Sequence, residues 1–351
     1  FIDFDGQTVV APYWNGGNPI FCAPAELTNA QMIRVFNQVA EDYRPFNLNI
    51  TTDSAVYFAA PITRRQRIVV TPTSSWYGSA GGVAYVESFR WGLEIPGFVF
   101  STLLGNNDKR VAEATSHETG HTLGLYHQSQ YNSTCGFVNE YNPGLGSGEI
   151  SWAPIMGNSY ARNITVWHNG PNSFGCNNLQ NDLAIIASSM NGFGYRTDDV
   201  GNTTAAAGNI SFSGNDYAVS GFVNGSTDVD LFKVSLPKDG RFTLNGKPFA
   251  VARPLTNNPA DSVRTTNIDL QLSLLNNSGA TIATFNPSTS VNATIDSNLT
   301  AGTYYIRVAS TSNANASNYG MLGNYAMTGT FFANGTLPVY SLTLNGSNNK
   351  G

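Results

Sequence analysis

Three of the four histidines in this 351-residue chain share one short segment and one spacing. Residues 117–127 read His-Glu-x-x-His-x-x-Gly-x-x-His. On an α-helix, residues four apart lie on one face, about 40° apart around the axis, so His117 and His121 can reach the same ion. Gly124 can adopt positive φ and end the helix in a sharp turn, which lets His127 fold back as a third ligand. Three imidazoles with one open position are typical of a catalytic zinc site.

Glu118 lies next to these ligands and supplies a carboxylate to the same site. Water on a zinc ion has a pKa lowered toward about 7, and a neighbouring carboxylate can act as the general base that accepts its proton. The chain has no convincing serine or cysteine nucleophile motif, so we predict hydrolysis by an activated water without a covalent intermediate. The alternative is a helix with incidental histidines, and it requires three of the four to fall into this spacing by chance.

The extended motif resembles the signature of the metzincin zinc peptidases. That family places a methionine turn beneath the zinc-binding histidines, and the segment SWAPIMGNSY supplies Met156 for this position. Some metzincins also have a tyrosine two residues after the methionine that approaches the zinc. Here that position is Asn158, and the nearest tyrosine is Tyr160, which is either a catalytic group or a packing residue in the pocket wall. The resemblance covers roughly residues 1–195.

Residues 82–89, GVAYVESF, are rich in strand-forming types. The resemblance implies that this strand lines the cleft as a sheet edge, where an extended peptide would pair with it antiparallel. Small residues such as Gly82 and Ala84 would let a second backbone approach closely. A fully paired strand inside the sheet is equally compatible with the sequence.

The pattern around these motifs predicts an α+β metzincin-like catalytic domain over residues 1–197, with a mixed twisted sheet and an active-site helix. Thr28 and Gln31 form a capping box before an apolar helical face that continues to Tyr43. Further helices are expected over 108–123 and 179–190, and strands over 1–10, 48–52, 67–71 and 82–89.

From residue 198 to 351 the chain shows only short strand patterns separated by turns, which predicts an all-β antiparallel sandwich. The clearest strands are VDLFKVSL, GRFTL, IDLQLSLL, ATIATF, GTYYIRV, YAMTGTFF and VYSLTL. This region resembles the pre-peptidase C-terminal domain of secreted bacterial peptidases, through TDDVGNT, STDVDLFKVSL and LTAGTYYIRV. We expect it to fold independently, so that a fragment ending near Tyr195 keeps peptidase activity.

The resemblance also implies a possible calcium site, because an acidic linker and the early strands can bind calcium in that family. The oxygen ligands available for Ca²⁺ are Asp198, Asp199, Asn202, Asp228 and Asp230. The alternative is a set of solvated turn carboxylates with no ion, and the sequence leaves both open.

Composition excludes several classes of partner. Charged residues make up 12% of the chain, the net charge is −5 and there are no Lys/Arg runs, so nucleic acid and anionic membranes are poor partners. No apolar stretch reaches the roughly 18 residues of a membrane span. Cys135 and Cys176 lie in loop sequence, where a disulfide is favoured in an extracellular protein, against three free thiols that include Cys22.

Together these observations predict a secreted, monomeric zinc endopeptidase that acts on proteins or glycoproteins. Two alternatives stay open. One is a peptidase specific for glycoproteins, and the other is an adhesin that binds glycans or proteins on a peptidase scaffold. The intact Glu118 argues against the adhesin, since a binding scaffold has no physical need of that base. Cleavage specificity is set by pocket shape, which the sequence does not give.

Overall fold

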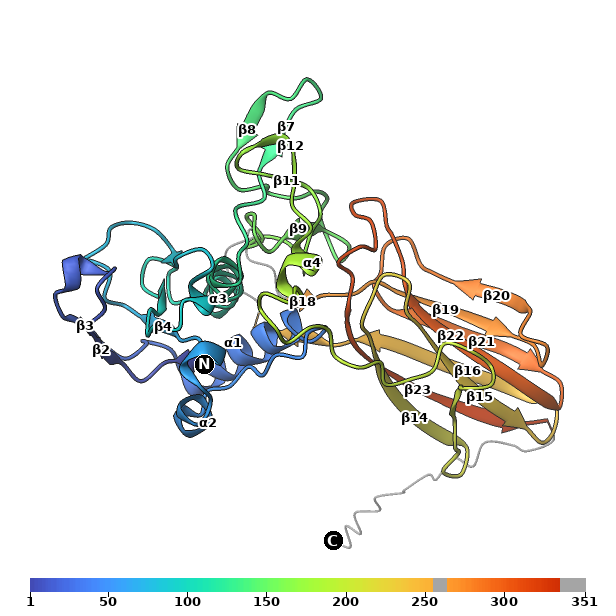
Figure 1. Cartoon of the computed structure of the whole chain (residues 1–351). Coiled ribbons are helices and arrows are strands. Elements are labelled where there is room, and N and C mark those ends of the chain that lie inside the picture. Colours follow the sequence, from blue (N-terminus) through green and yellow to red (C-terminus); the bar gives the residue numbers. More distant parts are fainter. Residues whose placement is uncertain (255–263, 335–351) are drawn as a thin grey trace, which may run out of the picture.

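The computed structural model describes residues 1–254 and 264–334. Within these residues the chain is rich in β-strands and contains four short α-helices (Figure 1). None of those helices combines the length and the apolar character needed to cross a membrane. Two regions are distinct in the view, one built around the helices and one built of long strands.

The first region contains a four-stranded sheet in the order β1 (Ile2–Asp3), β4 (Ile68–Thr71), β6 (Gly97–Phe100) and β5 (Gly82–Val83). The first three strands are parallel, and β5 pairs antiparallel with β6 at one edge. Helix α3 (Asp108–Thr122) packs against β4, β6 and α1 (Asn29–Asp42). This arrangement holds the predicted zinc helix next to the edge strand.

Helix α1 begins as predicted, because Thr28 and Gln31 form the reciprocal hydrogen bonds of a capping box. Its apolar face is fully buried at Val35 and Val39, and Tyr43 continues this face beyond the helix end. Helix α3 also lies where predicted, and its cap is Asn107, whose side chain accepts from Lys109 N at 3.0 Å and Arg110 N at 3.1 Å. An Asn at this position satisfies two of the free N–H groups of the first turn.

Four predicted elements are divided, shorter than expected or absent. The strand expected over 1–10 is split into β1 and β2 (Gln7–Val9), with Gly6 at a φ of 90° between them. Residues 48–52 form no strand, although Thr51 O accepts from Ile2 N. The predicted strand 82–89 ends at Val83, because Glu87 adopts a left-handed φ of 68° and residues Ser88–Arg90 form a 3₁₀ turn. The last helix is only α4 (Asp182–Ile186), which starts at a side-chain cap from Asn181.

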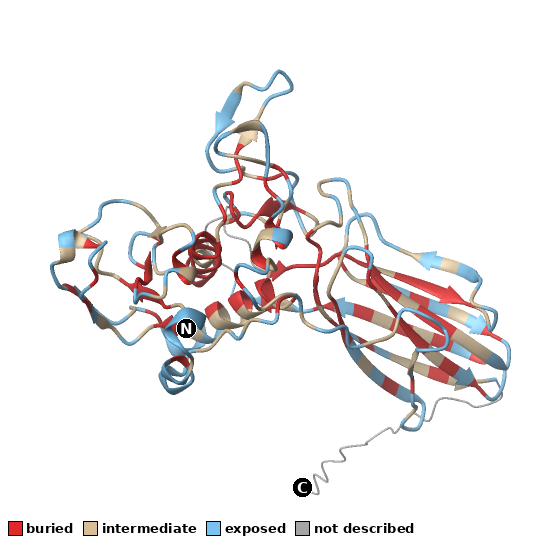
Figure 2. Cartoon of the chain, viewed as in Figure 1, coloured by how far each residue is buried: buried red, intermediate tan, exposed pale blue. Residues whose placement is uncertain are grey.

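The second region is a β-sandwich, as predicted. One sheet has the order β13 (Gly208–Asn209), β15 (Val229–Leu236), β22 (Gly302–Ser310), β19 (Leu270–Leu275) and β20 (Thr281–Phe285). The other has the order β14 (Asp216–Val223), β23 (Gly323–Ala333), β16 (Gly240–Pro248) and β21 (Ala293–Leu299). The strands of these two sheets pair antiparallel except for the edge strand β13, which runs parallel to β15. Buried and exposed residues alternate along these strands (Figure 2), which is the pattern of a sheet with one face in the core. The expected strand VYSLTL lies outside the described residues.

The two regions share a sheet, which the sequence did not indicate. Strands β9 (Trp152–Pro154) and β10 (Ile164–Val166) come from the first region, and β17 (Ala250–Ala252) and β18 (Arg264–Thr266) come from the second. The order is β17-β18-β10-β9, with Ile164 opposite Thr266 in a parallel pair. One hydrophobic cluster also contains residues of both regions. The expectation that residues from 198 fold independently therefore does not match the packing.

A disulfide-linked lobe projects from the first region at the top of Figure 1. It consists of two small hairpins, β7 (Gln130–Tyr131) with β8 (Phe137–Asn139) and β11 (Pro171–Asn172) with β12 (Gly175–Leu179). The predicted disulfide between Cys135 and Cys176 joins them. The remaining pair of strands is β2 (Gln7–Val9) with β3 (Ile20–Cys22), and helix α2 is Ser54–Ala59. Cys22 is a buried free thiol, and burial raises its pKa to about 12.

Candidate metal centre

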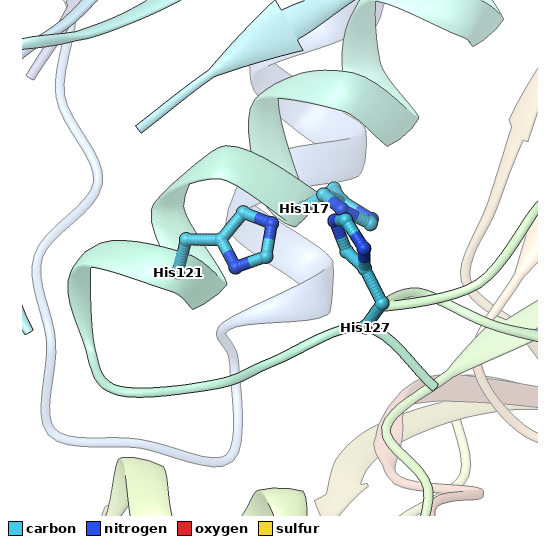
Figure 3. A group of neighbouring side chains, drawn as sticks. All are labelled: His117, His121 and His127. Atoms are coloured by element: carbon cyan, nitrogen blue, oxygen red, sulfur yellow. The ribbon is translucent and has the colours of Figure 1, made fainter. Parts of the chain in front are cut away.

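The three predicted zinc ligands converge at the end of α3 (Figure 3). One ligand atom of each of His117, His121 and His127 lies within 4.8 Å of the others. His117 and His121 project from consecutive turns of the helix, and His127 approaches from the segment that follows it. The three rings are thus arranged around one point, as ligands of a single ion would be.

The turn that returns His127 is a Schellman motif. Leu125 N donates to Gly120 O at 3.0 Å, and Gly124 N donates to His121 O at 2.9 Å. Gly124 has a φ of 107°, a conformation that side-chain-bearing residues rarely adopt. The role predicted for Gly124, ending the helix in a sharp turn, is the role it has in the structure.

Each imidazole is oriented by a hydrogen bond to its Nδ1 atom. His117 Nδ1 lies 2.9 Å from Ile155 O, His121 Nδ1 lies 2.7 Å from Leu125 O, and His127 Nδ1 lies 2.8 Å from a carboxylate oxygen of Glu140. Such bonds place the proton on Nδ1 and leave Nε2 as the metal-binding atom. Glu140 was not predicted, because it lies thirteen residues after His127 at no characteristic spacing.

Burial keeps these rings in the ligating state. It lowers the pKa of His117 well below the usual range, lowers that of His127, and lowers that of His121 to about 4. Neutral imidazole is the form that binds a metal. The donor set, its tautomers and its protonation all fit zinc.

Glu118 faces the same cleft from α3. The residue is 6% exposed, and its Oε2 atom has no hydrogen-bond partner within the described part of the chain. Burial raises the pKa of this carboxyl well above the usual range, an effect that a cation in front of it would oppose. A Cβ atom at Gly82 would lie 2.6 Å from Glu118 Oε1, so the carboxylate packs directly on the edge strand and a larger residue at position 82 would displace it.

Met156 packs against the helix that carries His117 and His121. It is fully buried, and its Sδ would lie 2.6 Å from a Cβ atom at Gly120, one residue before His121. Its carbonyl accepts from Gln128 N at 2.8 Å, next to His127. The polarisable thioether thus packs on α3 between the turns that carry His117 and His121, and its role as an apolar floor under a metal stays an expectation from the resemblance.

A cleft of about 650 Å³ opens in front of these residues. Its walls include Gly82, Ala84 and Tyr160, three of the residues that the sequence predicted for substrate contact. Three further tyrosines, Tyr77, Tyr126 and Tyr141, line it and were not predicted. The Tyr141 ring centroid is 4.4 Å from that of His127. No spacing rule marks this residue in the sequence.

A second cluster lies where the polar linker meets the sandwich. One carboxylate oxygen each from Asp198, Asp228 and Asp230 lies within 4.8 Å of the others. A terminal amide atom of Asn202 is 2.7 Å from Val229 O, 3.1 Å from Asp228 Oδ1 and 3.3 Å from Asp198 Oδ2. An amide nitrogen there would donate to all three oxygens, whereas an amide oxygen would join them around a cation.

Asp199, the fifth predicted calcium ligand, is not part of this group, and its Oδ1 accepts from Phe222 N at 3.2 Å. Asp230 accepts a hydrogen bond from Tyr325 Oη through Oδ2, and its Oδ1 is buried without a partner among the described residues. Burial raises the pKa of Asp230 to about 8, and neighbouring carboxylates add to this. The site therefore concentrates oxygen atoms that a divalent cation would satisfy.

The comparisons with known proteins concern the second region. Residues 228–310 match the family described as the bacterial pre-peptidase C-terminal domain. This part of the chain is thus a pre-peptidase C-terminal domain, within the range that the sequence resemblance indicated. No curated protein matches the chain.

Solved structures resemble the chain only distantly. The pre-peptidase C-terminal domain of a Bacillus anthracis collagenase has 13% identity and a TM-score of 0.24, over 38% of this chain and 97% of that one. A periplasmic inhibitor of g-type lysozyme from Aeromonas hydrophila has 10% identity and a TM-score of 0.25, over 36% and 96%. A family 35 carbohydrate-binding module from Clostridium thermocellum has 16% identity and a TM-score of 0.17, over 32% and 90%. Similarity at this level does not establish a shared function.

Proposed function

We propose that this chain is a secreted zinc endopeptidase of the metzincin type. The observation that carries the proposal is the convergence of three oriented, neutral imidazoles next to a buried carboxylate in an open cleft. The packing of Met156 against the helix that carries His117 and His121 supports the same assignment. The disulfide between Cys135 and Cys176 supports an oxidising compartment, as does the family of the second region.

His117, His121 and His127 would hold the zinc, and a zinc ion at this position would activate water and polarise a substrate carbonyl. Glu118 then serves as general base: its free Oε2 accepts the proton of the attacking water and returns it to the leaving amine. The edge strand β5 fixes this carboxylate, since Gly82 lies against Oε1. A buried base that is held in place needs no reorganisation during the reaction.

The cleft fits an extended polypeptide. Strand β5 is the free edge of its sheet and lies on the cleft wall, so its unpaired main-chain groups can hydrogen-bond a substrate strand. Main-chain pairing would set the register of the scissile bond and leave side-chain preference to the pockets. Tyr160 and Tyr141 lie on the walls where a hydroxyl could donate to the carbonyl oxygen under attack.

We expect one tightly bound zinc per chain, measured by elemental analysis of the purified protein. His127→Ala should weaken zinc binding and abolish cleavage of a casein-type protein substrate, because two imidazoles remain where three are needed. The matched control is His168→Ala, since His168 is the one histidine outside the cluster and packs on Trp152. A protein that contains no zinc, or equal zinc affinity for the two variants, would contradict the proposal.

A binding protein on a peptidase scaffold remains the second candidate, and a glycoprotein-specific peptidase is the third. The free base Glu118 favours an enzyme over an adhesin. Incubating the full chain with matched peptides and glycopeptides separates the three. Cleavage of both supports a general endopeptidase, cleavage of glycopeptides alone supports the specific enzyme, and binding without cleavage supports the adhesin.

We also propose a structural Ca²⁺ held by Asp198, Asn202, Asp228 and Asp230. Calcium should raise the unfolding midpoint of the full chain in calorimetry, and EGTA should remove the increase, because an ion that binds only the folded state stabilises it. Asp228→Asn should lose this response. Asp296→Asn, a change at an exposed carboxylate on the same sandwich, should keep it. A full response in Asp228→Asn would place the calcium elsewhere.

A further inference from the structure

A buried polar chain connects the second region to the zinc helix. Arg253 follows β17, and its side chain is 3% exposed. Its guanidinium donates to Gln38 Oε1 on α1 and, at 2.8 Å, to Thr265 Oγ1 on β18. Its Nε lies 3.3 Å from an oxygen of Asp108, the first residue of α3. A single residue of the second region thereby forms a hydrogen bond to α1 and an ion pair with α3.

The chain continues from Gln38 to the methionine turn. Gln38 Nε2 donates to Glu113 Oε1 at 2.7 Å, and Lys109 Nζ donates to the same oxygen at 2.7 Å. The other Glu113 oxygen accepts from Ser159 Oγ, and Lys109 Nζ donates to Ser159 O at 3.0 Å. Glu113 and Lys109 lie on α3 and are 1% exposed, and Ser159 follows Met156 by three residues. These bonds fix the methionine turn against α3.

A second connection reaches the residue before His117. Asn267 Nδ2 donates to Asp42 Oδ1 at 2.7 Å and to Thr165 O on β10 at 2.9 Å. Asp42 Oδ2 accepts from Ser116 Oγ at 2.5 Å. Asp42, Ser116 and Asn267 are all buried. The second region is therefore bonded to α3 at its beginning and close to its metal ligands.

We propose that Arg253 and Asn267 are positioning residues for the metal centre, so that the pre-peptidase C-terminal domain is part of the catalytic unit. His117 and His121 move with α3, whereas Ile155 O and Met156 move with the segment after β9. The orientation of His117 depends on the 2.9 Å contact between these two bodies. A small rotation of α3 would break it, and loss of such a supporting contact costs roughly 10–100-fold in metal affinity.

The test compares Arg253→Met with Arg241→Met in the full-length chain. Arg241 lies on the sandwich surface, pairs with Asp296 and is 61% exposed, so it controls for the loss of a charge. We expect Arg253→Met to weaken zinc affinity about tenfold in a chelator competition, within the range for supporting contacts. It should lower kcat with KM unchanged, and speed amide exchange in residues 113–121 of the metal-free protein. Arg253→Lys should restore part of each effect, and Arg241→Met should match the wild type.

The positioning role would be overturned if Arg253→Met kept wild-type zinc affinity, kcat and amide exchange. A lower melting temperature would not change that conclusion. If Arg253→Met does not fold, the same measurements are made on Arg253→Lys, which keeps the charge but cannot make the same set of bonds. Wild-type values for all of them in Arg253→Lys would then overturn the positioning role. The inference rests on the proposed function only through the zinc and kcat measurements. A wild-type protein that binds no zinc refutes that function, whereas the exchange measurement still tests the connection to α3.

Discussion

Glu118→Gln is expected to lower kcat by roughly 10²–10⁴-fold, the usual contribution of a general base, while zinc content stays at the wild-type level. The substitution keeps the size and shape of the side chain, so its packing against Gly82 is retained. It removes only the ability to accept a proton. The rate of cleavage of a short peptide gives kcat, and elemental analysis of the same samples gives the zinc content.

The control for this change is Glu94→Gln, which alters a glutamate far from the histidines that pairs with Arg65 and Tyr57. It should leave kcat within a factor of two or so, as surface substitutions usually do. Near wild-type turnover in Glu118→Gln would remove the general-base role. If instead both variants bind a glycoprotein as the wild type does, and none of the three proteins cleaves it, the adhesin is correct.

A chain ending at residue 197 should fail to form the metal centre. The truncation removes β18, the partner of β10, and the donors Asn267, Arg253 and Asn324. Asp42, Gln38 and Glu41 would lose these donors, and each buried acceptor left unpaired costs about 1–3 kcal/mol. Several such losses approach the whole stability of a typical domain, about 5–15 kcal/mol. The earlier expectation that such a fragment remains active is thus reversed.

Cooperative thermal unfolding, zinc content and peptide cleavage of the fragment measure this outcome. We expect no cooperative transition, zinc content far below one per chain and no cleavage. Adding residues 198–351 as a separate chain is the control, because restored activity would show that the missing contacts, rather than an unrelated folding defect, are the cause. A fragment that unfolds cooperatively and cleaves the peptide would show that the shared sheet is dispensable.

The parts of the site that the sequence predicted are those specified by local rules. His117, His121 and Gly124 follow from helical spacing and from the helix-ending turn, and the cap at Thr28 follows from a three-residue pattern. Tyr141 and Glu140 reach the site through a loop path that no spacing records. They became visible only when the fold placed them beside His127.

The contact between the two regions is the other feature that the sequence did not predict. Strands β17 and β18 have three residues each, too few to show an alternating pattern, and β18 pairs with β10, which lies about 100 residues away in the sequence. Composition changes at residue 198, which marks where the linker begins but not which strands pair across it. Long-range pairing depends on complementary buried surfaces, and neither partner reveals these alone.

The shared sheet also determines when the protein becomes complete during its synthesis. About 140 residues separate His127 from Thr266, and at 5–20 residues per second their translation takes roughly 7–28 s. Throughout that interval Asp42 lacks Asn267, and once β10 has been made it still lacks β18. All the proposed zinc ligands have then been made, but the supports that orient them have not. The order of the elements along the chain thus delays completion of the proposed metal centre, and with it the proposed peptidase activity.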